Sequence, residues 1–558
     1  MRRVVLLAVL AAAAGAELIA RVPVRARHGM VATREAHATE IGVAVLESGG
    51  NAIDAAVAVG FALAVTHPSA GNIGGGGFLL ARFADGRTAF LDFRERAAEK
   101  ASRDMYLDPD GKVTRDSVVG YRASGVPGTV RGLELAHQKY GRKKWAELVE
   151  PAVRLASEGF PVSYGLARSL RSAHASERLS AFPESKRIFL RDGNYYEAGE
   201  RLVQPDLART LERIRDRGAQ DFYEGETARL LAADVQAHGG LITLDDLKNY
   251  KVIERQPLTG GYRGYTILTA PPPSSGGVGI LQMLGVLEGS GYEKSGFGSA
   301  ATLHFMAEAM RRYFADRSEY MGDPDFYRVP VSGLLSPRYI AALRQSIDAE
   351  RATPSSSLHP GKPERYESSE TTHYSIVDAE GNAVAVTYTL NNSFGSAVTA
   401  TKLGFLLNDE MDDFAAKPGQ ANLFGLIQGE ANAIQPRKTP LSSMTPTIVL
   451  RDGKLCLVVG SPGGPTIINT VLEVVVDVID FGMNIADAVD APRLHHQWMP
   501  DVLDLERGFS PDTIALLQAR GHTVKIVDGQ GEVAAIQVQD GWLEASADPR
   551  TEGTAKGY

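Results

Sequence analysis

The chain of 558 residues has a globular composition, with 44% hydrophobic and 23% charged residues, and it is long enough to bury a sizeable core. Its net charge of −8 argues against a nucleic-acid-binding protein, which is usually basic. The single cysteine, Cys456, excludes an internal disulfide framework and a cysteine-based metal cluster. Because His495 and His496 are adjacent and no His-Glu-x-x-His sequence occurs, we expect no metal site and no cofactor.

The first sixteen residues have the pattern of a secretory signal peptide. Two arginines precede an apolar run that ends on small residues at 14–16, which predicts cleavage after Ala16. A buried N-terminal helix is the alternative, although core helices seldom begin with paired arginines. The run is too short to span a bilayer, and no later stretch supplies about 20 unbroken apolar residues. We therefore expect a periplasmic or secreted protein whose mature form has no membrane span.

The next part of the chain alternates between helices and a hairpin. Residues 38–66 predict two helices, the first ended by Gly49-Gly50 and the second by His67-Pro68. The glycine run at 74–77 then leads into a hairpin that turns at Asp85-Gly86. No Gly-Lys-Ser/Thr follows the run and a strand comes next, so a phosphate-binding loop is excluded. We expect this run to pack against the later hairpin described below.

Residues 128–250 are mostly helical in pattern, with a helix start at Thr243 and Asp246. The segment 262–284 predicts a strand, a Pro/Ser/Gly loop and a helix. Residues 352–370, "ATPSSSLHPGKPERYESSE", contain three prolines and five serines among few apolar groups, which is typical of a linker.

The chain changes character after this linker. Two β-rich runs surround "DAEGN", which is a strong hairpin signal. Strands are expected at 446–451 and 455–460, followed by a glycine loop that opens a nearly all-apolar, buried helix. Hairpins rather than regular βαβ units favour antiparallel sheets covered by helices.

The junction between linker and hairpin, "SSETTHYSIVD", carries a possible nucleophile. A threonine hydroxyl needs a neighbouring base, and the nearest base is the residue's own α-amine if the preceding peptide bond is cut. Such an amine has a pKa near 7.7–8.0, which suits a general base. Cleavage between Glu370 and Thr371 would therefore make Thr371 nucleophile and base together.

The hairpin register adds a second observation. If the turn centres on Glu380, Thr371 lies opposite Thr389, and a cross-strand hydrogen bond between the two hydroxyls becomes possible. The alternative is that both are ordinary strand threonines, and these two features alone do not exclude it.

The run "TTHYSIVDAEGNAVAVTYTLNNSFG", with "NDEMDDF", "PLSSMTPT" and "GSPGGPT" after it, resembles the γ-glutamyltransferases (glutathione hydrolases) of the N-terminal-nucleophile hydrolase superfamily. "GNIGGGGF", "DFRE" and "APPPSSGG" extend the likeness over essentially the whole mature chain. The resemblance implies an α+β fold, an αββα sandwich of two stacked antiparallel sheets between helical layers.

The resemblance also implies a role for each matching position. Thr371 is the nucleophile, freed by autocatalytic cleavage after Glu370 into a large fragment, 17–370, and a small one, 371–558. Thr389 is the threonine that hydrogen-bonds the nucleophile. The implied substrate and oxyanion groups are Arg94, Ser442 and Ser443 for the α-carboxylate, Asn391, Glu410 and Asp413 for the α-ammonium, and Gly463 and Gly464 for the oxyanion.

These implied roles agree with the chemistry of the side chains. Arginine can fork onto a carboxylate, two acids can share an ammonium, and glycine lets backbone N–H groups approach an oxyanion closely. For Arg94 the alternative is a surface ion pair with Asp92 or Glu95, and for "DEMDD" it is a solvated acidic loop or a calcium site. For the paired glycines it is a plain helix-entry turn.

Two positions depart from the pattern that the resemblance implies. Some bacterial relatives carry glutamine where Glu410 stands, although an acid still suits an ammonium. The segment "KPGQANLFGLIQGEAN" matches a lid over the pocket, and many bacterial members have tyrosine at the position of Phe424. Because phenylalanine cannot donate a latching hydrogen bond, looser gating is expected.

The expected activity is transfer of the γ-glutamyl group of glutathione or a similar compound to water or to an amino acid or dipeptide acceptor. The two fragments of the precursor would be each other's partner, as a heterodimer, and no nucleic acid is expected to bind. One alternative is a cephalosporin acylase that acts on a glutaryl side chain, which lacks the α-ammonium. Another is an unprocessed, non-catalytic binding protein.

Overall fold

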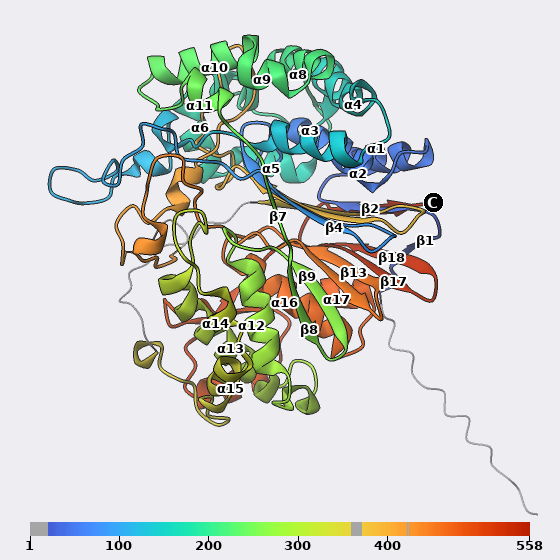
Figure 1. Ribbon diagram of the computed structural model, residues 1–558, viewed down its shortest axis with the longest axis vertical. Coiled ribbons are helices and arrows are strands. Elements are labelled where there is room, and N and C mark those ends of the chain that lie inside the picture. The colour runs from blue at the N-terminus through green and yellow to red at the C-terminus, as the bar shows by residue number, and fades with distance from the viewer. Residues whose placement is uncertain (1–20, 359–370, 421, 423–424) are drawn as a thin grey trace, which may run out of the picture.

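A computed structural model describes residues 21–358, 371–420, 422 and 425–558. Within these ranges, strands form two stacked seven-stranded sheets, and helices cover the outer face of each sheet (Figure 1). Neighbouring strands in both sheets are antiparallel. The expected αββα sandwich of the α+β class is confirmed.

The hairpin sheet contains, in spatial order, β19 (Thr554–Gly557), β2 (Met30–Thr33), β10 (Thr372–Val377), β11 (Ala383–Thr389), β3 (Gly76–Arg82), β4 (Thr88–Asp92) and β7 (Ile253–Arg255). The second sheet contains β1 (Val24–Ala26), β18 (Trp542–Ala547), β17 (Ala534–Gln539), β13 (Lys454–Gly460), β12 (Thr447–Arg451), β9 (Tyr265–Thr269) and β8 (Leu258–Tyr262). Phe78 of the hairpin sheet and Val458 of the second sheet belong to one continuous apolar core.

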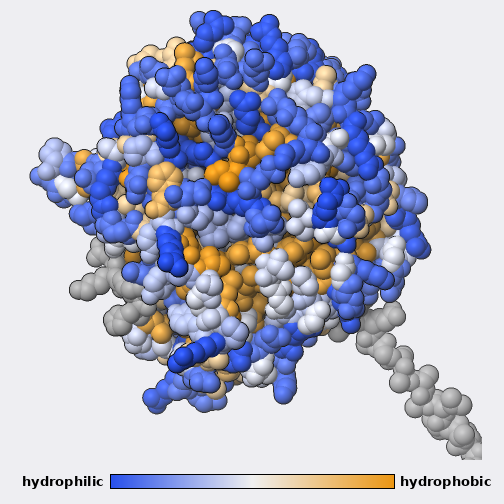
Figure 2. Space-filling model, viewed as in Figure 1, coloured by the Kyte–Doolittle hydropathy of each residue, from blue (hydrophilic) through white to orange (hydrophobic). Residues whose placement is uncertain are grey.

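The helical layers divide along the chain. The layer over the hairpin sheet contains α1 (Ala36–Glu47), α2 (Ala52–Thr66), α3 (Thr129–Tyr140), α4 (Trp145–Glu158), α5 (Tyr164–Arg171), α6 (Ala173–Ser180), α7 (Pro183–Phe189), α8 (Pro205–Arg217), α9 (Ala219–Glu224), α10 (Glu226–Ala237) and α11 (Leu244–Lys248). The opposite layer contains α12 (Gly276–Leu287), α13 (Ala300–Tyr320), α14 (Val331–Leu334), α15 (Pro337–Gln345), α16 (Thr466–Ile479), α17 (Ile485–Asp490) and α18 (Pro511–Ala519). Figure 2 shows hydrophilic side chains over both layers and apolar ones in the band between them.

Two smaller sheets are also described: a two-stranded one of β5 (Phe160–Pro161) and β6 (Arg201–Leu202), and a three-stranded one of β14 (Leu494–His495), β15 (Leu503–Glu506) and β16 (Val524–Val527). The predicted helix ends near residues 49 and 67, the capping box at Thr243 and the buried helix after the second glycine loop are confirmed. The predicted strands at 446–451 and 455–460 are confirmed within one residue at each end.

The predicted hairpin register is confirmed. Thr372 pairs with Tyr388 and Val377 with Ala383, so Thr371 and Thr389 lie opposite each other just beyond the paired residues. The turn is fixed by Asp378, whose carboxylate accepts a hydrogen bond from the backbone N–H of Ala52, the first residue of α2, at 2.9 Å. This bond ties the turn of the hairpin to α2, while Thr371 and Thr389 lie at the opposite end of the two strands.

The glycine run beside this hairpin has a packing role, as predicted. A Cβ atom on Gly75 would lie 2.0 Å from the carbonyl oxygen of Thr389, and one on Gly77 would lie 2.3 Å from that of Thr387. Because no side chain fits in these gaps, β3 can approach β11 only with glycine at these positions.

The start of the predicted linker, which the structure describes as far as residue 358, does not have the character of a free linker. Thr353 donates hydrogen bonds from its backbone N–H and its hydroxyl to Glu308, at 3.0 and 2.6 Å. The buried Ser355 accepts a hydrogen bond from the Trp498 indole at 2.9 Å. The first residues of this segment are therefore anchored. The predicted signal peptide, residues 359–370 and Phe424 lie outside the described residues.

Candidate active site

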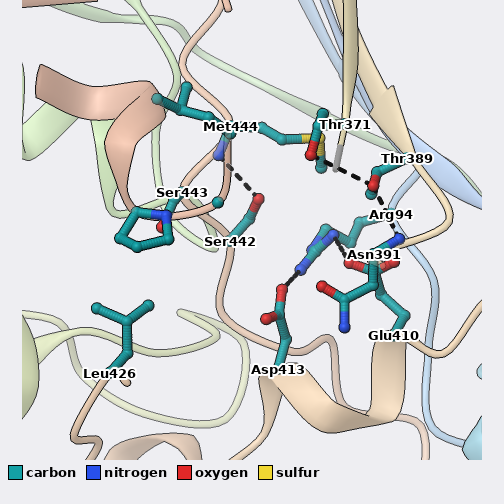
Figure 3. A pocket seen from close by; sticks show the side chains of 13 residues that line it. Arg94, Thr371, Thr389, Asn391, Glu410, Asp413, Leu426, Ser442, Ser443 and Met444 are labelled. Carbon is teal, nitrogen blue, oxygen red and sulfur yellow. Dashed lines mark hydrogen bonds and ion pairs between the residues drawn. The ribbon is translucent and has the colours of Figure 1, made fainter. Parts of the chain in front are cut away.

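A small cavity opens at the end of the β10–β11 hairpin where Thr371 and Thr389 lie. Every predicted catalytic or binding residue except Gly463 lines it, and Figure 3 shows most of them pointing toward one another. Its lining consists of Arg94, Thr371, Thr389, Asn391, Glu410, Asp413, Leu426, Ser442, Ser443, Met444, Gly464, Pro465 and Ile467.

Thr371 and Thr389 meet at the floor of the cavity. The Thr371 hydroxyl donates to the Thr389 hydroxyl oxygen at 3.4 Å, and the same oxygen accepts the backbone N–H of Asn391 at 2.8 Å. Asn391 has φ +77°, a left-handed conformation that turns the chain sharply after β11. This turn places Thr389 where it can orient the Thr371 hydroxyl.

His373, two residues from Thr371, does not serve as the base for it. Its ring bonds the hydroxyls of Thr387 and Ser375 at 2.8 and 3.1 Å, and a Cβ on Gly460 would overlap it. Burial lowers the pKa of His373 to about 3, so the ring is neutral. A base for Thr371 must come from another group, such as its own α-amine.

The paired glycines lie at the entrance to α16. Gly463 and Gly464 have φ of +133° and +53°, which residues with a side chain rarely adopt. Within the described chain neither of their N–H groups donates to another residue, and α16 begins at Thr466. Backbone donors at a helix N-terminus favour a negative charge, so this corner can stabilise an oxyanion.

Arg94 is neither a surface residue nor paired on the surface with Asp92 or Glu95. Its side chain is 1% exposed, and its two terminal nitrogens form ion pairs with Glu410 and Asp413 (Figure 3). The acidic segment is therefore not a solvated loop, because its carboxylates are turned inward onto a guanidinium. The cationic and anionic halves of the predicted clamp therefore touch each other.

The carboxyl groups around Arg94 carry more negative charge than this single guanidinium can balance. Glu95 is fully buried and lies 3.8 Å from Arg94. Burial raises the pKa of Glu410 to about 8; the Arg94 charge opposes this shift and the Asp413 charge adds to it. Burial also raises the pKa of Glu95 and of Asp413. Since three carboxyl groups share one guanidinium, part of the group holds a proton near neutral pH. A bound ammonium would allow the carboxylates to ionise.

The remaining polar side chains leave unused hydrogen-bonding groups toward the cavity. Asn391 donates from its side-chain amide to the carbonyl of Asp409 at 3.0 Å, which leaves its own amide oxygen as an acceptor. Ser442 Oγ accepts the Met444 N–H at 3.1 Å, so its hydrogen remains available as a donor. The Asn391 amide oxygen suits an ammonium, and the Ser442 hydroxyl suits a carboxylate.

Several lining residues were not predicted from the sequence. Met444, Ile467 and Leu426 supply an apolar wall, and they sit beside the predicted motifs without a chemical signal of their own. Ser274 and Ser275 of "APPPSSGG" explain why that motif accompanies the site. The Ser274 hydroxyl donates to the carbonyl of Met444, and the Ser275 hydroxyl to that of Ser442, both at 2.7 Å.

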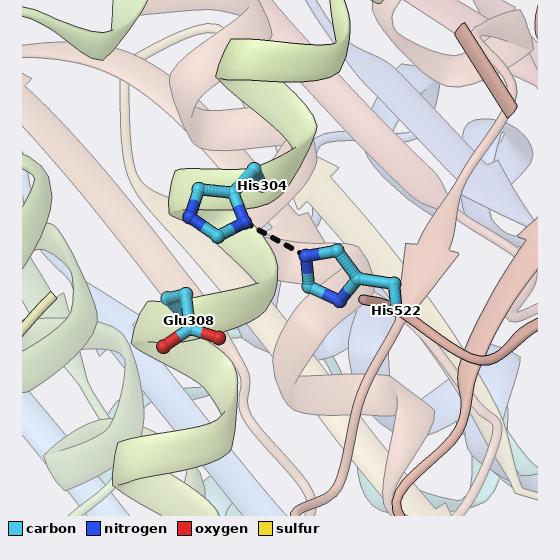
Figure 4. Close-up of side chains that lie close together, drawn as sticks. All are labelled: His304, Glu308 and His522. Carbon is cyan, nitrogen blue, oxygen red and sulfur yellow. Dashed lines mark hydrogen bonds between the residues drawn. The ribbon is translucent and has the colours of Figure 1, made fainter. Parts of the chain in front are cut away.

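A second cluster of candidate ligands occurs away from this cavity. His304, Glu308 and His522 have ligand atoms within 4.8 Å of one another (Figure 4). However, the two rings are hydrogen-bonded to each other at 2.8 Å, and Glu308 pairs with Arg311 and Arg312. These pairings favour a structural network over a metal site. The long sequence separation explains why no motif indicated the cluster.

Comparisons with known proteins agree with the geometry. The family model described as gamma-glutamyltranspeptidase matches residues 38–558. The chain is 52% identical over 531 residues to a glutathione hydrolase proenzyme of Escherichia coli (strain K12), covering 95% of this chain and 91% of that protein.

Solved structures show the same fold. The crystal structure of cephalosporin acylase from Bacillus halodurans has a TM-score of 0.86 at 28% identity, covering 96% of this chain and 97% of that one. The crystal structure of Helicobacter pylori gamma-glutamyltranspeptidase has a TM-score of 0.57 at 47% identity, covering 60% of this chain and 96% of that one.

Proposed function

The chain belongs to the γ-glutamyltranspeptidase family, and we propose that Thr371 carries its reaction after the bond to Glu370 is cleaved. The protein is an autoprocessed γ-glutamyltransferase, with γ-glutamyl compounds such as glutathione as its donors. The observation that supports the proposed site best is the position of Thr371, hydrogen-bonded to Thr389 at the floor of a cavity lined by both halves of an amino-acid clamp.

In the first half-reaction, Thr371 Oγ attacks the γ-carbonyl carbon while the Thr371 α-amine takes the hydroxyl proton. The negative charge on the former carbonyl oxygen rests on the N–H groups of Gly463 and Gly464. Collapse of this intermediate breaks the C–N bond, and the leaving amine takes the proton from the α-ammonium. For glutathione the leaving amine is cysteinylglycine.

In the second half-reaction, water or the amine of an acceptor amino acid or dipeptide attacks the γ-glutamyl ester of Thr371. The α-amine again takes the proton, and the Thr371 hydroxyl is restored when the ester bond breaks. The residues assigned to this sequence need no metal or organic cofactor. The large and small fragments, 17–370 and 371–558, would form one heterodimer, because both contribute residues to the cavity.

The clamp distinguishes this activity from that of a glutaryl acylase. A glutaryl anilide lacks the ammonium, so Glu410, Asp413 and the Asn391 amide oxygen would have no substrate ammonium to bind. We expect kcat/KM for a γ-glutamyl anilide to exceed that for the glutaryl anilide by on the order of 10³-fold, because buried polar groups left unpaired reject such an analogue strongly. Steady-state turnover of the two anilides measures the ratio. A ratio near one, or in favour of glutaryl, would identify an acylase.

The raised pKa of Glu410 predicts how amino-acid binding depends on pH. Burial raises the pKa of Glu410 to about 8, so the protonated share of its carboxyl group grows as the pH falls below 8, whereas an ammonium requires the ionised form. Affinity is therefore lost as the pH falls through 8, by up to about tenfold per unit. The inhibition constant of L-glutamate, measured from pH 6 to 9, should show this loss. In Glu410→Gln the dependence should flatten, and an unchanged profile would contradict the assignment.

Export is proposed from the sequence of residues 1–16, which lie outside the described residues. Among the described helices, none is long and apolar enough to cross a membrane. The non-catalytic alternative is disfavoured by the Thr371–Thr389 contact and by the unused N–H groups of the paired glycines.

A further inference from the structure

A second buried arginine lies behind the carboxylate half of the cavity. Arg317 belongs to α13 and is 2% exposed. Its Nε donates to Ser275 Oγ at 2.9 Å and its Nη2 to Ser443 Oγ at 3.3 Å. In the described structure Nη1 has no hydrogen-bond partner. Among the described residues, the hydrogen-bond partners of this cation are thus two hydroxyls.

A guanidinium in such a place is costly to bury, since hydroxyls do not balance its charge. Burial lowers the pKa of Arg317, while Tyr313 and the cavity residue Asp413 oppose that effect. The positive charge therefore faces the wall of the cavity, where an anionic group of a ligand would stabilise it.

The arginine also restricts the Ser443 hydroxyl. Because Ser443 Oγ accepts a hydrogen bond from a cation, its own hydrogen must be donated to a different group. Within the described chain no residue accepts that hydrogen, and Ser443 lines the cavity (Figure 3). The hydroxyl is thereby oriented as a donor toward a ligand.

Ser275 connects this arginine to the other serine of the pair. The backbone N–H and the hydroxyl of Ser275 both donate to the carbonyl oxygen of Ser442, at 2.8 and 2.7 Å. The Tyr313 hydroxyl, one helical turn before Arg317, donates to the Ser275 carbonyl. Two helices of the large fragment, α12 and α13, therefore brace the serine pair of the small fragment.

We propose that Arg317 is a positioning residue for the substrate α-carboxylate: held by Ser275, it directs the Ser443 O–H into the cavity and adds positive charge behind it. The proposal deepens the proposed function and rests on its assignment of Ser443 to the carboxylate. Arg317 acts through Ser443, and it does not itself line the cavity.

A double-mutant cycle on the processed heterodimer tests this coupling. The variants are Arg317→Met, Ser443→Ala and the two combined, and the measurement is the inhibition constant of L-glutamate against turnover of a γ-glutamyl anilide. Each single change should raise the constant about tenfold, the typical effect of a hydrogen bond to a charged group. The constant of the double variant should exceed that of either single variant by no more than about threefold, since both substitutions remove the same interaction. For Arg317→Met, the value of kcat should stay within about threefold of wild type.

Two controls separate positioning from a general structural role. The α-amide of L-glutamate lacks the α-carboxylate charge, so its inhibition constant should change less than about twofold in Arg317→Met. Arg317→Lys keeps the charge and a donor, and it should recover part of the affinity.

The outcomes also separate this proposal from the proposed function. If Ser443→Ala leaves the glutamate constant unchanged, the assignment of Ser443 to the carboxylate fails. Two other outcomes overturn only the role of Arg317. In the first, Ser443→Ala raises the glutamate constant, but the effects of the two single substitutions multiply in the double variant. In the second, Arg317→Met weakens the binding of L-glutamate and of its α-amide equally. Should Arg317→Met not fold, Ser275→Ala replaces it in the same cycle, with a several-fold rise expected that disappears in the Ser443→Ala background.

Discussion

Replacing Thr371 with alanine is expected to leave the chain as a single full-length polypeptide and to abolish γ-glutamyl transfer. The hydroxyl is the proposed nucleophile both for the cut after Glu370 and for the half-reactions that follow. Loss of a nucleophile that works with its own base lowers turnover by on the order of 10⁴-fold or more. A denaturing gel with intact-mass analysis measures the cut, and turnover of a chromogenic γ-glutamyl anilide measures the activity.

The adjacent threonine provides a matched control. Thr372 is fully buried, and its hydroxyl has no hydrogen-bond partner in the described structure. Thr372→Val keeps the shape and removes only that hydroxyl, so it should be cleaved and active within about threefold of wild type. Thr371→Ser, which retains a hydroxyl, should recover cleavage in part. Equal processing in Thr371→Ala and Thr372→Val would show that Thr371 is not the nucleophile.

Replacing Arg94 with methionine is expected to lower kcat/KM by on the order of 10³-fold, since a charge-assisted clamp on the substrate is lost together with the cation that balances Glu410 and Asp413. Without that cation, the buried carboxyl groups would take up protons and bind an ammonium poorly. Truncating one partner of a buried ion pair should also cost about 3–5 kcal/mol of unfolding free energy. Arg94→Lys should recover little, because lysine cannot fork onto two carboxylates.

Arg255 offers the control for this substitution. It also pairs with two carboxylates, Asp92 and Asp325, each at 2.8 Å, but it does not line the cavity. Arg255→Met should therefore lose stability and keep kcat/KM within about threefold of wild type. Thermal unfolding and steady-state kinetics of both variants separate the two effects. Similar kinetic losses in both would mean that Arg94 acts through stability alone.

Local patterns predicted the parts of the molecule that local geometry determines. The turn at 378–382 set the pairing of β10 with β11, so the opposition of Thr371 and Thr389 followed from counting residues. Glycines at 74–77 indicated close packing because only glycine permits it. The linker predicted from composition was wrong at 352–355, because the residues that anchor this segment, Glu308 and Trp498, are far away in sequence.

The cavity could be predicted residue by residue only through the family resemblance. Arg94 and Glu410 are 316 positions apart, and nothing near either residue in the sequence indicates that they touch. The contact of Arg317 with Ser443 escaped prediction for the same reason, because a helical arginine in "ADRSEY" has no local signal of burial. Long-range ion pairs follow from how the two sheets stack, which the chain specifies only as a whole.

The most direct test of the catalytic assignment is the intact mass and N-terminal sequence of the purified wild-type protein. The expected result is two polypeptides in equal amounts, the smaller of which begins Thr-Thr-His-Tyr at Thr371 and ends at Tyr558. A single uncut chain that still turns over a γ-glutamyl anilide would contradict the account, as would a small fragment that begins at any other residue.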